Sequence, residues 1–224
     1  MATVTHVAGL NVGEFAALVY AGVIGFPDAL KLVSERGKVM EDAIREMPTG
    51  VVSVFGPGCE QLEGFLEKNY PCMKISTYLA DNQHTVGGTD DECDAFVKSL
   101  KGKYRVEMDV IDVRKLRVAG AFHSPHMNQA SEAVNSLLAG IELTRPSLPV
   151  IMNVNGYQVD DPLEIKEILG QQLTAAVKWK QSVLTAYVSG VHSFIEVAPG
   201  RVLSSIVKKR IKECKDCNVE FIRV

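Results

Sequence analysis

The amino-acid sequence predicts an α/β fold in which a small ferredoxin-like subdomain is inserted into a larger core. An apolar run at residues 4–8 breaks at Gly9, and a helix-forming run follows from Gly13. This pattern predicts a strand, a sharp turn and a helix. Further along, residues 51–111 alternate between strand-like and helix-like patterns in the order β-α-β-β-α-β, which is the order of a ferredoxin-like unit.

The predicted subdomain follows a breaker cluster, Met-Pro-Thr-Gly, at residues 47–50. Thr89 is a good N-cap and marks the start of the second helix. The chain is therefore expected to divide into a core of residues 1–47 plus 118–224 and a subdomain of residues 48–117. The expected elements of the subdomain are a strand at 51–55, a helix at 59–68, strands at 73–79 and 84–87 around a turn at 81–82, a helix at 90–100 and a strand at 104–111.

The core is expected to contain a long helix that starts at Phe26, because Pro27 suits the first helical turn and Asp28 favours the helix N-terminus. An apolar stripe through Leu32 and Met40 supports this helix. The other expected core elements are helices at 13–23, 129–143, 162–172, 179–188 and 202–212 and strands at 149–154 and 193–197.

The composition excludes several classes of protein. The chain has 224 residues, 46% of them apolar, and a net charge of −3, so nothing indicates a nucleic-acid-binding surface. No uncharged apolar stretch is long enough to predict a membrane span. Five cysteines without framework spacing predict a soluble protein of a reducing compartment, either the cytoplasm or an organelle matrix such as that of the mitochondrion. The pair Cys214 and Cys217 lacks further ligands nearby, so no metal site is predicted.

The turn at the start of the chain has the frame of a catalytic motif. Gly9, Asn11 and Gly13 have the spacing of a nucleophile elbow, G-x-S-x-G, in which two glycines allow a tight turn that presents the central side chain. The central residue here is an asparagine, whose amide nitrogen is not nucleophilic. The sequence therefore contains an acyl-transfer frame in which the reacting residue is replaced.

Several longer stretches resemble the malonyl-CoA:acyl-carrier-protein transacylase family. The stretch GLNVGEFAAL from Gly9 is similar to GxSxGE(Y/F)xAL, and GAFHSPHM from Gly120 is similar to the segment that carries the general base. EVAPGRVL from Glu196 and the residues Gln83 and Gly88 match further motifs, and the resemblance extends to about Val207. It implies an α/β-hydrolase-like acyltransferase core with an inserted ferredoxin-like subdomain.

The resemblance also implies roles for particular residues. Asn11 occupies the nucleophile position, and His123 would be the base, with a pKa near neutrality. Arg36 would pair with the free carboxylate of malonate. The backbone carbonyl of Gln172 would orient the histidine, although counting along the chain leaves the neighbouring Gln171 open.

Two further residues complete the implied site. The backbone N–H of Val12 would be one donor of the oxyanion hole, and Phe122 corresponds to an aromatic residue that accompanies malonyl units in related acyltransferases. The family's first strand and its GQGSQ-like loop have no counterpart in this sequence. The chain is therefore expected either to be part of a longer protein or to have lost an oxyanion donor. Apolar surface left by that segment predicts poor solubility or dimerisation.

The implied reaction is ping-pong transfer of malonyl from malonyl-CoA to the phosphopantetheine thiol of acyl carrier protein, with no bound cofactor. Three hypotheses remain open. The chain is a malonyltransferase whose Asn11 arose from a gene model or a recent mutation, an inactive relative that binds CoA thioesters or acyl carrier protein, or an α/β-type hydrolase. Arg36 and the ferredoxin-like insert argue against the hydrolase. The replacement of serine by Asn11 and the missing oxyanion donor predict a poor enzyme. Ser124 is badly placed to substitute for a serine at the elbow.

Overall fold

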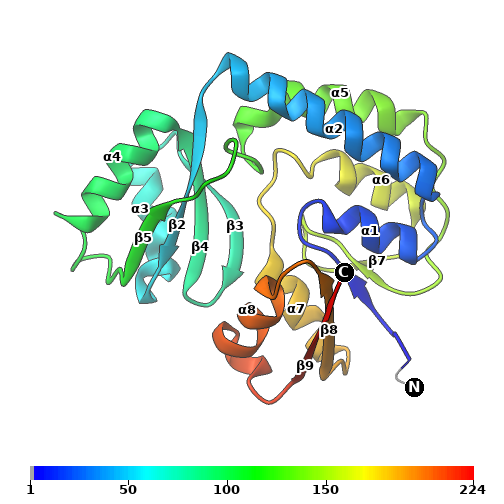
Figure 1. Cartoon of the computed structure of the whole chain (residues 1–224). Coiled ribbons are helices and arrows are strands. Elements are labelled where there is room, and N and C mark those ends of the chain that lie inside the picture. The colour runs from blue at the N-terminus through cyan, green and yellow to red at the C-terminus, as the bar shows by residue number, and fades with distance from the viewer. Residues whose placement is uncertain (1–2) are drawn as a thin grey trace.

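The computed structural model describes residues 3–224 and places two parts of the chain around separate hydrophobic cores. In the larger part, a three-stranded sheet has the order β1-β6-β7, with β1 parallel to β6 and β6 antiparallel to β7. Helices lie against this sheet and stack above it (Figure 1). The elements of this part are β1 (Val7–Ala8), β6 (Val150–Ile151), β7 (Gln158–Val159), α1 (Gly13–Tyr20), α2 (Phe26–Glu46), α5 (Asn128–Ala139) and α6 (Pro162–Gly170).

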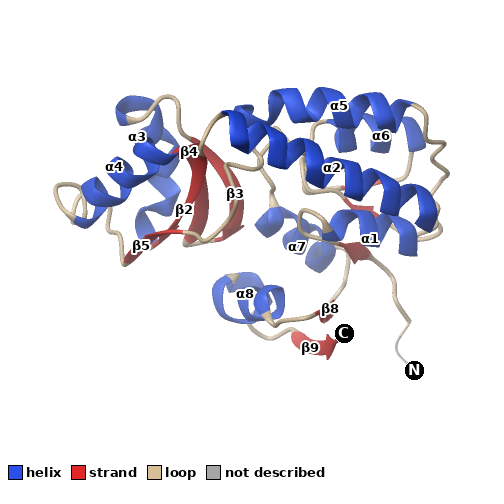
Figure 2. Ribbon diagram, turned by 45° about the horizontal axis from the view of Figure 1, so that its top comes forward, coloured by secondary structure: helices blue, strands red, loops and turns tan. Residues whose placement is uncertain are grey.

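The smaller part contains an antiparallel four-stranded sheet with the order β3-β4-β2-β5. Figure 2 shows α3 and α4 on one face of this sheet, while its other face is turned toward the rest of the molecule. Both faces are therefore covered, which explains why β2 is buried along almost its whole length. The elements are β2 (Thr49–Phe55), a 3-10 turn (Pro57–Gln61), α3 (Leu62–Asn69), β3 (Lys74–Ala80), β4 (Gln83–Thr89), α4 (Asp90–Lys101) and β5 (Asp112–Lys115).

The start of α4 agrees with the prediction from sequence. The hydroxyl of Thr89 accepts a hydrogen bond from the backbone N–H of Glu92 at 3.3 Å, and the Glu92 carboxylate accepts one from the backbone N–H of Thr89 at 2.8 Å. This capping box satisfies two backbone donors that would otherwise lack partners.

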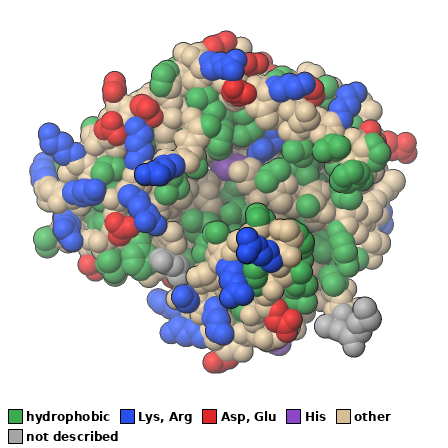
Figure 3. All heavy atoms as spheres, viewed as in Figure 1, with side chains coloured by type: hydrophobic (Ala, Val, Ile, Leu, Met, Phe, Trp, Pro, Cys, Tyr) green, Lys and Arg blue, Asp and Glu red, His purple; other side chains and the backbone are tan. Residues whose placement is uncertain are grey.

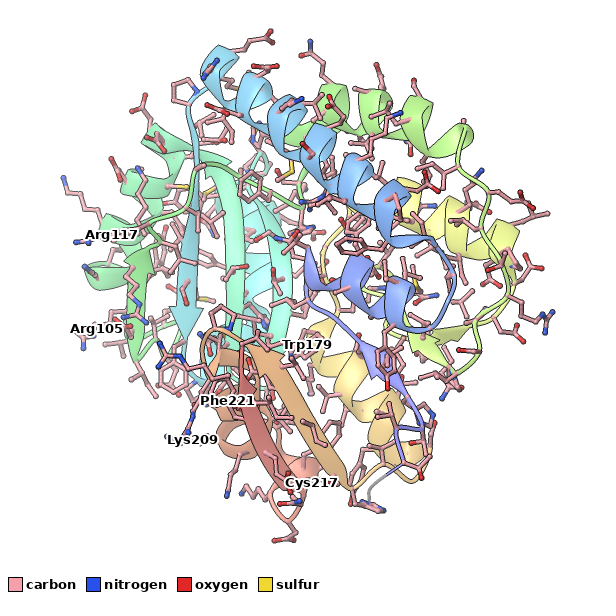
Figure 4. The ribbon with its side chains drawn as sticks, turned by 45° about the vertical axis from the view of Figure 1, so that its right-hand side comes forward. Arg105, Arg117, Trp179, Lys209, Cys217 and Phe221 are labelled. Carbon is pink, nitrogen blue, oxygen red and sulfur yellow. The ribbon has the colours of Figure 1, made fainter. Side chains whose placement is uncertain are left out.

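The C-terminal part of the chain forms a third hydrophobic cluster, which includes Trp179 and Cys217. Figure 4 shows both residues beside the two-stranded sheet. The cluster meets the four-stranded sheet at Ala80, the last residue of its strand β3, and the adjacent Asp81 forms an ion pair with Lys180 at 2.5 Å. Its elements are α7 (Trp179–Val188), β8 (Ser193–Ala198), α8 (Val202–Arg210), a 3-10 turn (Lys212–Cys214) and β9 (Asn218–Arg223), with β8 and β9 parallel.

The structure corrects several expectations. The strand expected at 104–111 is wrong, because this segment forms consecutive turns and the pairing with β2 falls on Asp112–Lys115 instead. The strands expected at 4–8 and 149–154 shrink to two residues each, because only these pair with one another. Strand β9 was not expected at all. In the part of the chain that the structure describes, no helix has the length and apolar character needed to cross a membrane.

Candidate active site

The turn between β1 and α1 has the backbone of a nucleophile elbow. Asn11 adopts a φ of +57°, a left-handed conformation that is uncommon for a residue with a side chain. A Cβ atom on Gly9 would lie 2.0 Å from the carbonyl oxygen of Gly13, whereas a Cβ on Gly13 would have no heavy atom within 4 Å. The expectation that both glycines are needed for the turn is therefore corrected: only Gly9 lacks room for a side chain.

This asymmetry gives a matched pair of substitutions. Gly9→Ala is expected to lower the free energy of unfolding by about 3 kcal/mol, because the backbone around Gly13 must move. Gly13→Ala is expected to change it by less than about 1 kcal/mol. Urea unfolding followed by circular dichroism measures both. Equal losses of stability in the two variants would show that the backbone of Gly13 does not approach Gly9 as closely as described.

Asn153, which follows β6, holds the elbow on both sides of its central residue. Its Oδ1 accepts a hydrogen bond from the backbone N–H of Asn11 at 2.8 Å. Its Nδ2 donates to the carbonyl oxygen of Gly9 at 2.6 Å. Asn153 is 1% exposed, so both bonds are shielded from water and hold the strained turn in place.

His123 lies beside the elbow with its ring oriented by the backbone. Its Nδ1 is 2.7 Å from the carbonyl oxygen of Gln172. Because a carbonyl only accepts, Nδ1 carries the proton and Nε2 retains its lone pair. Nε2 is buried and has no hydrogen-bond partner among the described residues. His123 also has a positive φ, +59°.

The pKa of His123 differs from the expected near-neutral value. Burial lowers the pKa to about 4, the hydrogen bond to Gln172 acts in the opposite direction, and the charge of Arg36 lowers it further. The imidazole is therefore neutral at pH 7. This is the protonation state that a general base needs before it accepts a proton.

Arg36 projects from α2 toward the elbow and is 5% exposed. Its Nη2 donates to Oδ1 of Asn11 at 2.5 Å, and its guanidinium lies 5.8 Å from the ring centroid of Phe15. Burial lowers its pKa to about 10, and the nearby Glu14 counteracts this. Arg36 is therefore a buried cation at pH 7 whose planar group faces the side chain at the nucleophile position.

The other residues predicted from sequence have less direct contacts. Val12 precedes α1 and is 51% exposed. Phe122 is partly buried and packs against the larger core. The hydroxyl of Ser124 donates to the carbonyl oxygen of Ala121 at 2.6 Å, which fits the view that it does not replace the elbow residue. Gln172, not Gln171, supplies the carbonyl beside His123.

Sequence reasoning missed two residues of this site, Glu14 and Asn153. Glu14 is 1% exposed and accepts hydrogen bonds from the backbone of Asn153 and the side chain of Gln172. Burial raises its pKa to about 7, although these hydrogen bonds and Arg36 lower it. The signals available were an acidic residue in the otherwise apolar stretch GEFAALVY and an amide directly after a buried strand.

The site lies where the two larger parts of the molecule meet. Arg36 comes from α2, Asn11 from the turn before α1, and His123 from the segment that follows β5. Figure 3 shows that the face drawn there is hollowed between these parts, with a histidine and a basic side chain visible inside the hollow. The arrangement brings together a buried cation that can bind an anionic group, an oriented imidazole that can act as a base, and an elbow whose central residue, Asn11, is not a nucleophile.

Comparison with known proteins gives concordant findings. The family described as "Acyl transferase domain" matches residues 3–222. The mitochondrial malonyl-CoA-acyl carrier protein transacylase of Mus musculus is 32% identical over 215 residues, covering 90% of this chain and 55% of the relative. The chain thus spans about half the length of that relative.

Two solved structures are similar over the whole chain. An acyl carrier protein S-malonyltransferase from Vibrio cholerae has a TM-score of 0.90 and 27% identity, and 71% of its own chain is covered. A malonyl-transacylase solved in complex with its type II PKS acyl-carrier protein has a TM-score of 0.87 and 26% identity, with 70% of its chain covered. These similarities agree with the predicted α/β acyltransferase fold.

Proposed function

Because this chain belongs to the acyl transferase domain family, we propose that it carries a site for malonyl transfer from malonyl-CoA to acyl carrier protein. The observation that supports this most directly is that Arg36 donates a hydrogen bond to the elbow residue Asn11. His123 is tied to the same residue through Gln172, whose backbone carbonyl accepts from His123 and whose side chain donates to Asn11. A buried guanidinium at this point would select an acyl group that ends in a carboxylate.

In the proposed reaction, which this chain can carry out only with the substitution Asn11→Ser, the hydroxyl at position 11 attacks the thioester carbonyl while Nε2 of His123 takes the proton. The carbon–sulfur bond then breaks, and the CoA thiolate leaves with that proton, so that a malonyl ester remains on the elbow. The phosphopantetheine thiol of the carrier protein attacks this ester by the same steps in reverse. The N–H of Val12, at the start of α1, would stabilise the oxyanion in each step.

Gln172 and Phe122 have supporting roles in this proposal. The carbonyl of Gln172 keeps the proton on Nδ1 of His123, so that Nε2 faces the reacting group. Phe122, next to the base, would line the space for the malonyl unit. The partner would be a phosphopantetheinyl acyl carrier protein, as in the solved complex of a similar transacylase. The compartment would be the cytoplasm or an organelle matrix, as the mitochondrial relative illustrates.

Asn11 limits what this chain does as written. Its amide does not attack a thioester, and its Oδ1 already accepts a hydrogen bond from Arg36. Because the elbow residue is not a nucleophile, a second candidate function is that the chain binds a malonyl thioester or acyl carrier protein without turnover. The substrate carboxylate would then take the place of the Asn11 oxygen at the guanidinium.

Intact-protein mass spectrometry after incubation with malonyl-CoA tests the proposal. Asn11→Ser is expected to gain one malonyl group and to lose it on addition of holo acyl carrier protein. Asn11→Ala serves as the matched control and is expected to gain none. Binding of malonyl-CoA without an adduct in any variant would favour the second function, and the absence of both binding and adduct would refute both.

A further inference from the structure

We propose that Glu14 is a positioning residue of this site, whose carboxylate holds Asn153 and Gln172 and, through them, the elbow and His123. The inference rests on the proposed function only in taking His123 as the base. Glu14 lies in the first turn of α1, directly after the elbow, and is 1% exposed. A buried carboxylate is costly unless its oxygens are well bonded, so its contacts indicate what it is placed to do.

The hydrogen bonds of Glu14 are all accepted from donor groups of Asn153 and Gln172. Its Oε1 accepts from the backbone N–H of Asn153 at 2.6 Å. Its Oε2 accepts from Nε2 of Gln172 at 2.5 Å. An ionised carboxylate has only acceptors, whereas the protonated form carries an O–H that needs an acceptor of its own. The surroundings therefore suit the charged form.

Each partner of Glu14 extends to a residue with strained backbone. Asn153 bonds both sides of the elbow, as described above, and fixes Asn11. The side chain of Gln172 donates to the carbonyl oxygen of Asn11 at 3.1 Å, while its own backbone carbonyl accepts from His123. Asn11 and His123 are two of the three non-glycine residues with positive φ in the described chain. Such conformations persist only where the surroundings hold them firmly.

The charge of Glu14 also sets the orientation of the Gln172 amide. Nε2 of Gln172 faces two oxygens, those of Glu14 and Asn11, whereas Oε1 has no partner within residues 3–224. A rotated amide would place Oε1 against both oxygens, which is unfavourable while Glu14 is ionised. Protonation reverses this preference, because the O–H of Glu14 then donates to Oε1. The bond from Gln172 to Asn11 is lost in that state.

This change in orientation falls near neutral pH. Burial raises the pKa of Glu14 to about 7, and the ionised form is the one that prevails above it. Neither Arg36, whose charge acts on Glu14, nor His123 itself changes charge in this range. Arg36 on α2 has a pKa of about 10, and His123 has a pKa of about 4. A change near pH 7 in the NMR resonance of His123 would therefore report the titration of Glu14.

The test is a pH titration of the ¹⁵N-histidine-labelled chain by NMR, followed through the Nδ1–H resonance of His123. The native chain is expected to show a shift with its midpoint near the pKa of Glu14, about 7. Glu14→Gln is expected to lose this step. Ser76→Ala is the matched control. This variant also loses a buried hydrogen bond, the one to the hydroxyl of Thr85, but the bond lies in the four-stranded sheet, so the step at His123 should remain.

A second variant covers the case in which Glu14→Gln does not fold. Gln172→Met retains the backbone carbonyl that orients His123 but removes the amide, so the step at His123 should again disappear. A step that persists in either folded variant, or its absence from the native chain, would overturn the proposal. The readout needs no malonyl-CoA, so it remains interpretable if the proposed function fails. Where Asn11→Ser is active, adding Glu14→Gln should slow malonylation by about 10²-fold.

Discussion

Replacing His123 with alanine in the Asn11→Ser chain is expected to slow formation of the malonyl-enzyme by roughly 10⁴- to 10⁶-fold, the range seen when a triad base is lost. Among residues 3–224 the imidazole is the one neutral base described beside the elbow, and Nε2 is the nitrogen left free by the bond to Gln172. Rapid quenching with malonyl-CoA followed by intact-mass analysis measures the rate.

His126 provides the matched control, because it is a second, half-buried histidine three residues further along the chain. His126→Ala should leave the rate within about threefold of the parent. The pH profile supplies an independent check. The pKa of His123 is lowered to about 4, so the reactive neutral form is present above that value and is lost as the pH falls through it. Protonation of Glu14 near pH 7 is itself expected to lower the rate, so this check is made with Glu14→Gln added. A profile of that chain that fell near the ordinary histidine pKa would contradict the described burial.

Replacing Arg36 with glutamine in the same chain is expected to reduce kcat/KM for malonyl-CoA by about 10²- to 10³-fold. Truncating one partner of a buried charge pair costs roughly 2–5 kcal/mol, and the substrate carboxylate would be that partner. Acetyl-CoA has no carboxylate, so its much slower reaction should change little. The ratio of the two rates, measured as acyl adduct formed over time, is therefore the diagnostic quantity.

Arg45 lies on the same helix but is exposed and pairs with Glu41 at 2.6 Å. Arg45→Gln should leave the ratio unchanged, because exposed ion pairs contribute little. Arg36→Lys should recover only part of the malonyl preference, since an ammonium does not match a carboxylate with two parallel bonds. Equal losses for malonyl-CoA and acetyl-CoA in Arg36→Gln would show that Arg36 supports the fold without choosing the acyl group.

Local signals in the sequence were reliable where local chemistry decides the structure. Thr89 begins α4 as its capping pattern predicts, and the helix expected at 179–188 has those bounds. The strand expected at 104–111 was wrong because Tyr104, Met108 and Val110 pack against the core from a series of turns, which the same hydrophobic spacing permits. Short strands such as β1 and β6 depend on a partner far along the chain, so their lengths are not encoded locally.

The candidate site shows the same difference between features that local sequence predicts and features that depend on distant residues. Asn11, Arg36 and His123 stand in recognisable motifs and meet around one turn. Glu14 and Asn153 belong to the hydrogen-bond network beneath them, which neighbouring residues in sequence do not reveal. The choice between Gln171 and Gln172 required coordinates as well, because a backbone carbonyl carries no side-chain signature.

The span of these hydrogen bonds has a consequence for biosynthesis. The bonds that tie the elbow segment to Asn153 and Gln172 connect positions 139 to 161 residues apart, whereas β3 and β4 are joined by a two-residue turn. Because the entropic cost of closing a loop grows with its length, the hairpin can form early. A nascent chain whose Gln172 is still inside the ribosome can therefore fold its four-stranded sheet. Its elbow segment still lacks the hydrogen bonds from Gln172 that complete the site.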